Sequence, residues 1–212
     1  MDSRHWLKRA AHQMGAVAIW AALVGVLSLA AGSSIASDAQ AATLEGQRFE
    51  DTMVLSDRTL RLNGLGLRGV AWIKAFVAGL YLAAPSKDSA QVLAMQGPKR
   101  IRLKIMLNAP SHELTKSLVG RIEDHEPDAV RIKLGDRLSR LGTQIDSLGD
   151  LHPGDVVDLD FIPDKGVSLR LNDKIIGVPV AGEDLYRSVL KIFVGDHPVD
   201  RRMKEGLLRG GV

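Results

Sequence analysis

The sequence predicts an α+β fold with antiparallel strands. Strand-like segments come first along the chain, a helical region follows, and further strands and helices close it, whereas regular alternation of strands and helices would indicate parallel βαβ units. Turns of only a few residues link several neighbouring strands, which favours antiparallel pairing. A chain of 212 residues with 45% hydrophobic residues is also long enough to enclose one full core.

Residues 1–41 have the layout of a secretory signal peptide. Basic residues precede an almost wholly apolar run over residues 14–31, and small residues surround a cleavage site after Ala41. We therefore expect a single domain over residues 42–212 that is periplasmic or secreted and keeps no stable membrane span. The apolar run, about 18–20 residues long, is also near the length that crosses a bilayer, so an uncleaved anchor is the alternative.

Composition excludes several classes of function. The chain carries 28 Lys and Arg against 25 Asp and Glu, without a basic stripe that alternates with aromatic residues, so we expect no nucleic-acid binding. Cysteine is absent, which excludes disulfides, thiol catalysis and cysteine-ligated metals. The phosphate-loop, zinc-protease and serine-hydrolase motifs do not occur either.

Histidines give no metal-binding pattern. Residues 42–212 contain four, at spacings that match no common metal motif: His112, His125, His152 and His197. The charged run Glu123–Glu126 is interpreted as a solvated helix end, because charge clusters beside a proline usually face water. Weak cation binding there is the alternative. We therefore expect neither a metal site nor a cofactor.

The first half of the domain is predicted to be mostly strand. Glu45 to Leu55 and Arg58 to Leu62 alternate as strands, with a turn between them. Gly64 and Gly66 then interrupt the alternation, which indicates a strand that is bent or bulged where a backbone or ligand comes close. The run from Val70 to Ala83 could be a strand or a buried helix, and its β-branched and aromatic content favours a strand.

A short helix and one more strand follow before the helical region. Asp88 to Met95 is predicted to be helical, and Lys99 to Leu107 reads as a strand with one buried and one solvent-facing side. On the side predicted to face solvent are Arg100, Arg102, Lys104 and Met106.

Two amphipathic helices are expected from Ser111 onward, separated at Pro127. Leucines and isoleucines recur at helical spacing on both sides of this proline, as far as Leu148. Such a stripe normally covers the domain's own sheet, although a partner-binding helix would show the same pattern. The chain then returns as three closely linked strands and two helices. These are Asp155 to Ile162, Val167 to Asn172, Lys174 to Val178, Glu183 to Val194 and Asp200 to Leu208.

Arg68 is a single arginine within the most apolar stretch of the domain. Arginine does not lose its charge, so a buried arginine needs an anionic or carbonyl partner. Its planar guanidinium suits a carboxylate or enolate oxygen. The alternative is that Arg68 lies at a strand end with its head in water, or pairs with an Asp or Glu of the same chain.

Two stretches of the sequence resemble the chalcone isomerase family. With the predicted signal peptide, the chain resembles a bacterial, exported member of that family. Asn63 to Gly69 followed by Ile73 to Leu82 is similar to the family's glycine-rich strand pair, and Leu185 to Val199 with Leu207-Leu208 is similar to its closing helix and terminal segment. The resemblance spans most of residues 44–210. It implies a large antiparallel β-sheet backed by a layer of helices, with a cleft between sheet and helices.

The resemblance also implies candidate site residues. In the plant enzymes an arginine of the glycine-rich strand holds the charge that develops on the substrate, while hydroxyls position the substrate and a water. Arg68 matches that arginine, but Phe76 and Ile192 stand where hydroxyls would be. Because the change removes donors and adds apolar surface, this cleft resembles that of the family's non-catalytic, fatty-acid-binding relatives more closely.

We therefore expect a binding protein with no catalytic residue. Arg68 is predicted to hold the carboxylate of a fatty acid or similar amphiphile, and Phe76 and Ile192 to enclose its tail. A haem carboxylate would suit the same cation. The alternatives are an intramolecular lyase of the chalcone isomerase type that acts on an enone, and a structural or partner-docking domain with no ligand.

Overall fold

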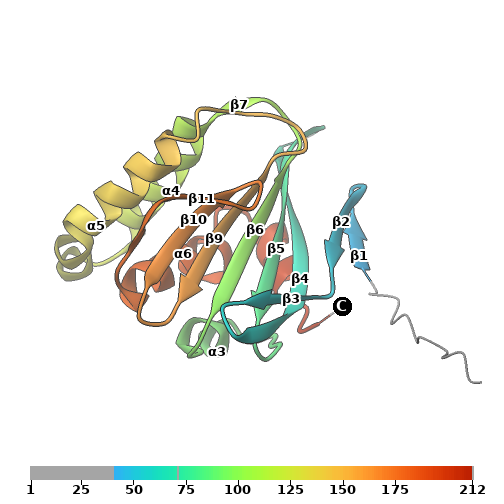
Figure 1. Ribbon diagram of the computed structural model, residues 1–212, viewed down its shortest axis with the longest axis horizontal. Helices are drawn as coiled ribbons and strands as arrows, with labels where there is room; N and C mark the ends of the chain where they lie inside the picture. The colour runs from blue at the N-terminus through green and yellow to red at the C-terminus, as the bar shows by residue number, and fades with distance from the viewer. Residues whose placement is uncertain (1–40, 71, 212) are drawn as a thin grey trace, which may run out of the picture. The chain divides into compact units, whose positions relative to one another are not determined.

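The computed structural model describes residues 41–70 and 72–211, so the predicted signal peptide lies outside the described residues. One large sheet dominates the fold, and the helices gather on one of its faces (Figure 1). Its seven strands are all antiparallel and have the order β11-β10-β9-β6-β5-β4-β3. The predicted α+β class and the large helix-backed antiparallel sheet are confirmed.

The elements of the sheet and its helices follow the chain in order. The sheet consists of β3 (Thr52–Leu55), β4 (Arg58–Val70), β5 (Ile73–Leu82), β6 (Lys99–Ile105), β9 (Val156–Ile162), β10 (Gly166–Leu171) and β11 (Lys174–Val180). The helices are α3 (Ser89–Ala94), α4 (Ser111–His125), α5 (Asp128–Asp146), α6 (Glu183–Val194) and α7 (Arg201–Leu207). Two small sheets pair β1 (Ala41–Leu44) with β2 (Gln47–Glu50) and β7 (Ala109–Pro110) with β8 (Asp150–Leu151). Within the described ranges, no helix is long and apolar enough to cross a bilayer.

The predicted strand from Glu45 to Leu55 is wrong as a single element. Glu45 and Gly46 both have positive φ angles, 51° and 75°, and close a tight turn between β1 and β2. A further break at Asp51 separates β2 from β3. The glycine at the second turn position removes the steric cost of this conformation, so the chain forms a hairpin where alternation alone indicates a continuous strand.

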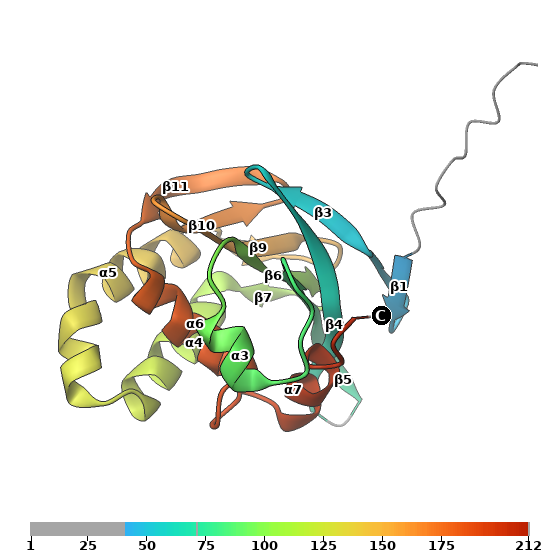
Figure 2. The ribbon, with the colours of Figure 1, turned by 90° about the horizontal axis from the view of Figure 1, so that it is seen from below.

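The amphipathic helices cover the sheet as predicted (Figure 2). The stripe on α4 and α5 is buried, with Leu118, Ile122, Leu134 and Leu141 at 3% exposure or less. Helix α6 also buries its apolar side against the same core. The helices thus complete the main hydrophobic core and form the second layer of the domain.

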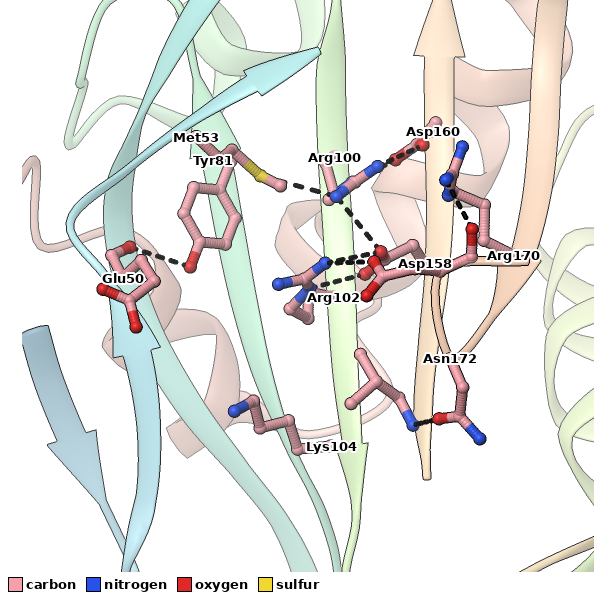
Figure 3. Close-up of polar contacts among 12 residues, drawn as sticks. Glu50, Met53, Tyr81, Arg100, Arg102, Lys104, Asp158, Asp160, Arg170 and Asn172 are labelled. Carbon is pink, nitrogen blue, oxygen red and sulfur yellow. Dashed lines mark hydrogen bonds and ion pairs between the residues drawn. The ribbon is translucent and has the colours of Figure 1, made fainter. Parts of the chain in front are cut away.

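Contrary to the sequence prediction, the strand Lys99 to Leu107 does not face solvent at Arg100 and Arg102. Arg100 is only 4% exposed, and its partners Asp158 and Asp160 on β9 are 1% exposed. Arg102 donates two hydrogen bonds of 2.8 Å to Asp158, and Arg100 lies 3.1 Å from the same carboxylate (Figure 3). Met53 of β3 contacts Arg100 across this face, with 3.7 Å between Sδ and Nη1. The sheet therefore curls over its own charged face and removes it from water.

Helix α7 packs against the glycines of β4. A Cβ on Gly66 would lie 2.5 Å from the carbonyl oxygen of Met203, and one on Gly64 would overlap the backbone of Gly206 and Leu207. The β4–β5 register also shifts between Leu62 and Gly64. Both parts of the sequence prediction for these glycines, a bulge and a close backbone, are confirmed.

An ion pair links the helical layer across α5 and α6. Arg137 donates hydrogen bonds of 2.7 and 2.9 Å to Asp184, and Lys133 lies 3.3 Å from the same carboxylate. The hydrogen bonds from Arg137 hold the pKa of Asp184 well below its usual range. The folded protein therefore binds this proton more weakly than the unfolded chain does.

We expect this pair to make stability depend on pH. Because the pKa of Asp184 is lowered by folding, its contribution is present above the pKa of an unfolded Asp, about 3.9, and is lost as the pH falls below that value. Asp184→Asn should cost about 1 kcal/mol at pH 7, since the pair is partly exposed, and progressively less as the pH falls below about 4. Urea unfolding of both proteins at several pH values measures this. Parallel stability curves would show that the pair does not contribute.

Candidate ligand-binding site

A cavity of about 280 Å³ lies between the sheet and helices α4 and α6. Its walls are mostly aliphatic and aromatic, and its side chains with polar groups are Arg68, Glu113 and Ser117. The volume is near the lower end of the range for small-molecule sites, roughly 300–1,000 Å³. The cleft that the family resemblance implies is therefore present, and the protein's own side chains do not fill it.

All three residues predicted to bind a ligand line this one cavity. Arg68 of β4 pairs with Phe76 of β5, which in turn pairs with Ile105 of β6, so the three side chains form a row across neighbouring strands. Ile192 of α6 belongs to the facing helical wall. Residues far apart in the sequence thus meet in one site.

The packing of α7 explains why Arg68 reaches the cavity. Gly64, Gly66 and Arg68 follow one another on the same face of β4, because side chains alternate along a strand. The backbone of α7 covers the two glycines. Arg68 lies beyond the start of the helix, and its side chain keeps 30% exposure. The guanidinium therefore places a permanent positive charge at a partly solvent-exposed position of a largely apolar cavity.

Arg68 pairs with a carboxylate of its own chain, as the alternative interpretation of this residue expected. Its Nη1 lies 3.4 Å from Oδ2 of Asp200. The other oxygen of Asp200 accepts the backbone N–H of Met203 at 3.0 Å and caps α7. The contact with Arg68 is longer than the 2.7–2.9 Å typical of charge-assisted hydrogen bonds. Among the described residues, Arg68 makes no other side-chain hydrogen bond, so its remaining donors are free for a ligand.

Sequence reasoning missed two polar residues of the cavity, Glu113 and Ser117. They lie four residues apart on α4, next to the apolar stripe formed by Leu114 and Leu118. That spacing beside a buried stripe is the signal that could have identified them. The side chain of Glu113 is 57% exposed, so water screens its charge.

The two tyrosines of the chain form hydrogen bonds outside the cavity. The hydroxyl of Tyr81 donates to the carbonyl of Glu50 at 2.9 Å, and that of Tyr186 donates to the carbonyl of Leu159 at 3.1 Å. Burial raises the pKa of Tyr81 to about 12 and that of Tyr186 well above its usual value. Neither hydroxyl lines the cavity, so the site has no phenol to act as an acid.

A smaller cavity of about 120 Å³ lies next to the first, and Ile192 lines both. Here the rings of His125 and His197 stack with centroids 4.7 Å apart. Glu126 is 7% exposed and accepts hydrogen bonds from Ser188 and Lys191 at 2.8 and 2.9 Å. The prediction that the whole Glu123–Glu126 run faces water is therefore wrong for Glu126, because α6 supplies partners that bury it. Within the described residues, no group of three or more His, Asp or Glu could hold a metal ion.

Comparisons with known proteins agree with this architecture. The fold resembles the crystal structure of a fatty-acid binding protein from Arabidopsis thaliana, with a TM-score of 0.62 and 18% sequence identity, over 80% of this chain and 96% of that chain. At this identity the likeness shows the fold alone. A comparison with curated proteins gives no match. The family model described as chalcone isomerase-like matches residues 41–209. The chain therefore belongs to the chalcone isomerase-like family.

Proposed function

We propose that this protein binds a fatty acid or a similar amphiphilic carboxylate without catalysis. The observation that carries the proposal is that Arg68, Phe76 and Ile192 line one largely apolar cavity. A permanent cation at a partly solvent-exposed position among apolar walls matches an anionic head followed by a hydrocarbon tail. The fold shared with a fatty-acid binding protein supports the same ligand class.

The two parts of such a ligand would contribute differently. Each methylene that leaves water contributes about 0.8 kcal/mol, so the tail supplies most of the affinity. A charge-assisted contact with Arg68 contributes on the order of 1.5–3 kcal/mol and sets the direction in which the ligand enters. Asp200 and Glu113 oppose a bound carboxylate, but Asp200 has a second role at α7 and Glu113 is largely solvated.

The proposed location is the periplasm, and its support is the sequence of residues 1–41. A water-soluble carrier for amphiphiles has a clear use in an aqueous compartment next to membranes. N-terminal sequencing of the purified protein tests cleavage after Ala41. Retention of the first residues would instead indicate an anchored protein.

Arg68→Gln tests the proposed role of the cation. We expect the dissociation constant for dodecanoate to rise roughly ten- to hundredfold, because a charge-assisted contact is lost. Arg61→Gln is the matched control, since Arg61 is an exposed arginine on the same strand. Titration calorimetry measures both affinities, and thermal unfolding shows whether each variant is folded. Equal affinity in a folded Arg68→Gln variant would refute the proposal.

Two further measurements separate the other functions. Native mass spectrometry of the purified protein identifies any co-purifying acid, and its absorbance spectrum shows whether that ligand is a haem. Isomerisation of a chalcone or similar enone that Arg68→Gln abolishes would instead support the enzyme alternative, in which Arg68 stabilises a developing oxyanion.

A further inference from the structure

The hairpin between β4 and β5 presents two large apolar side chains to solvent. Trp72 is 86% exposed, the highest value among the large hydrophobic residues that the structure describes, and Ile73 next to it is 53% exposed. An isolated exposed apolar residue needs no explanation, but neighbouring tryptophan and isoleucine side chains at a strand connection indicate a contact with something else. Trp72 lies in the turn between the two strands that carry Arg68 and Phe76, and Ile73 is the first residue of the second strand.

The hairpin tip lies next to the candidate binding cavity. Arg68 and Ala75, on the two sides of the tip, both line that cavity. Ile73 also lines a shallow groove, to which the start of α7 contributes Arg202. The apolar tip, the cationic end of the cavity and the start of α7 thus lie at one end of the domain.

The charges at this end leave an excess of exposed arginine. Two of its carboxylates already contact cations, since Glu45 lies 2.6 Å from Lys74 and Asp200 contacts Arg68. Arg201 and Arg202 are exposed and form no ion pair with the residues that the structure describes. The groove also carries one further charge of each sign, Glu205 and Arg209. Such a surface favours an anionic partner.

The size of the apolar patch decides between a protein and a lipid surface. A tryptophan offers about 150–250 Å² and an isoleucine less, whereas a stable protein interface buries roughly 800 Å² on each partner. Binding to a bilayer surface requires no such area. A few apolar side chains that enter the bilayer and nearby cations that attract anionic lipid both contribute to the binding free energy. Tryptophan is also the residue type that concentrates at the boundary between lipid and water.

We propose that the β4–β5 tip docks this protein on an anionic phospholipid surface. Trp72 and Ile73 enter the interface, and Arg201 and Arg202 contact lipid phosphates. Arg68 and the cavity then face the membrane in which amphiphilic acids reside. This orientation rests on the proposed function, whereas the docking itself does not.

The fluorescence of Trp72 provides a direct test. The other tryptophans of the chain, Trp6 and Trp20, precede the domain, so Trp6→Phe and Trp20→Phe in the full chain leave Trp72 as the sole emitter. We expect its emission to shift to shorter wavelength with phosphatidylglycerol-containing vesicles, and brominated lipid chains to quench it. An unchanged spectrum in the presence of bound vesicles would overturn the proposal.

Vesicle sedimentation without fatty acid measures the contribution of the tip. Trp72→Ser should weaken binding at least tenfold, as expected for a large apolar side chain that no longer leaves water. Ile132→Ser is the matched control, because Ile132 is 82% exposed on α5 and should have no effect. The paired change Arg201→Gln and Arg202→Gln should remove the preference for anionic lipid. All proteins are compared with the same N-terminus, the one that N-terminal sequencing identifies.

Two results would refute the docking proposal. One is equal vesicle binding by wild type and Trp72→Ser, and the other is a dimer in light scattering that Trp72→Ser converts to monomer, which would identify a second copy as the partner. Dodecanoate affinity in vesicle-free solution is measured separately. If the wild-type protein does not bind dodecanoate, the proposed function is refuted. The docking proposal does not depend on that result.

Discussion

Asp158→Ala is expected to lower the free energy of unfolding by about 3–5 kcal/mol. Asp158 is 1% exposed, accepts two hydrogen bonds from Arg102 and lies 3.1 Å from Arg100. Its removal leaves Arg102 without its main partner and Arg100 with Asp160 alone, in a region with little water. For a domain of this size, each kilocalorie shifts the melting temperature by roughly 2–4 °C. The melting temperature should therefore fall by about 6–20 °C in thermal unfolding followed by circular dichroism.

Asp173→Asn is the control for that change, because Asn removes the charge and tolerates the positive φ angle of 65° at this position. Asp173 lies 3.6 Å from Arg102, but its side chain is 83% exposed. An exposed pair of this kind contributes at most about 1 kcal/mol, so the melting temperature should change little. Similar melting temperatures for the two variants would show that the buried ion pairs of Asp158 contribute no more to stability than the exposed pair of Asp173.

Gly64→Val is expected to destabilise the domain by about 3 kcal/mol, the upper end of the usual cost of overpacking. Any Cβ at Gly64 overlaps the backbone of Gly206 and Leu207, and backbone atoms cannot rotate away as a side chain does. Helix α7 must therefore shift off β4. Denaturant unfolding measures the loss.

Gly120→Ala provides a comparison of opposite sign. Gly120 lies within α4, and no atom is within 4 Å of the position that a Cβ would take. Alanine there should stabilise the protein by about 0.5–1 kcal/mol, because it restricts the unfolded chain and favours the helix. A Gly64→Val variant as stable as Gly120→Ala would show that α7 is not held by close backbone packing.

Local patterns in the sequence predicted most of the elements. The helix Glu183–Val194 has the predicted bounds, because its apolar period is clear and Gly195 follows it. The sequence could predict that Arg68 and Phe76 lie close together, because they belong to consecutive strands. Only the family resemblance indicated Phe76 and Ile192 as site residues, and no local pattern places α6 over these strands.

The buried charges could not be predicted in the same way. Alternation of Arg100 and Arg102 with apolar residues normally indicates a solvent-exposed side of a strand. Their partner Asp158 lies more than fifty positions away in the sequence, and nothing in its own strand indicates a buried charge. Only the curl of the sheet brings Met53 over this face. The contact between Asp200 and Arg68 likewise depends on how closely α7 approaches β4, which sequence alone does not specify.

Asp200 belongs to two structures at once, because one of its oxygens caps α7 and the other lies beside Arg68. The proposed carboxylate ligand would compete with Asp200 for the guanidinium of Arg68. Its binding would leave Asp200 with the capping hydrogen bond to α7 alone. Under the proposed function, occupancy of the cavity and the stability of the first turn of α7 are thermodynamically coupled through Asp200, so a substitution of Asp200 should change both.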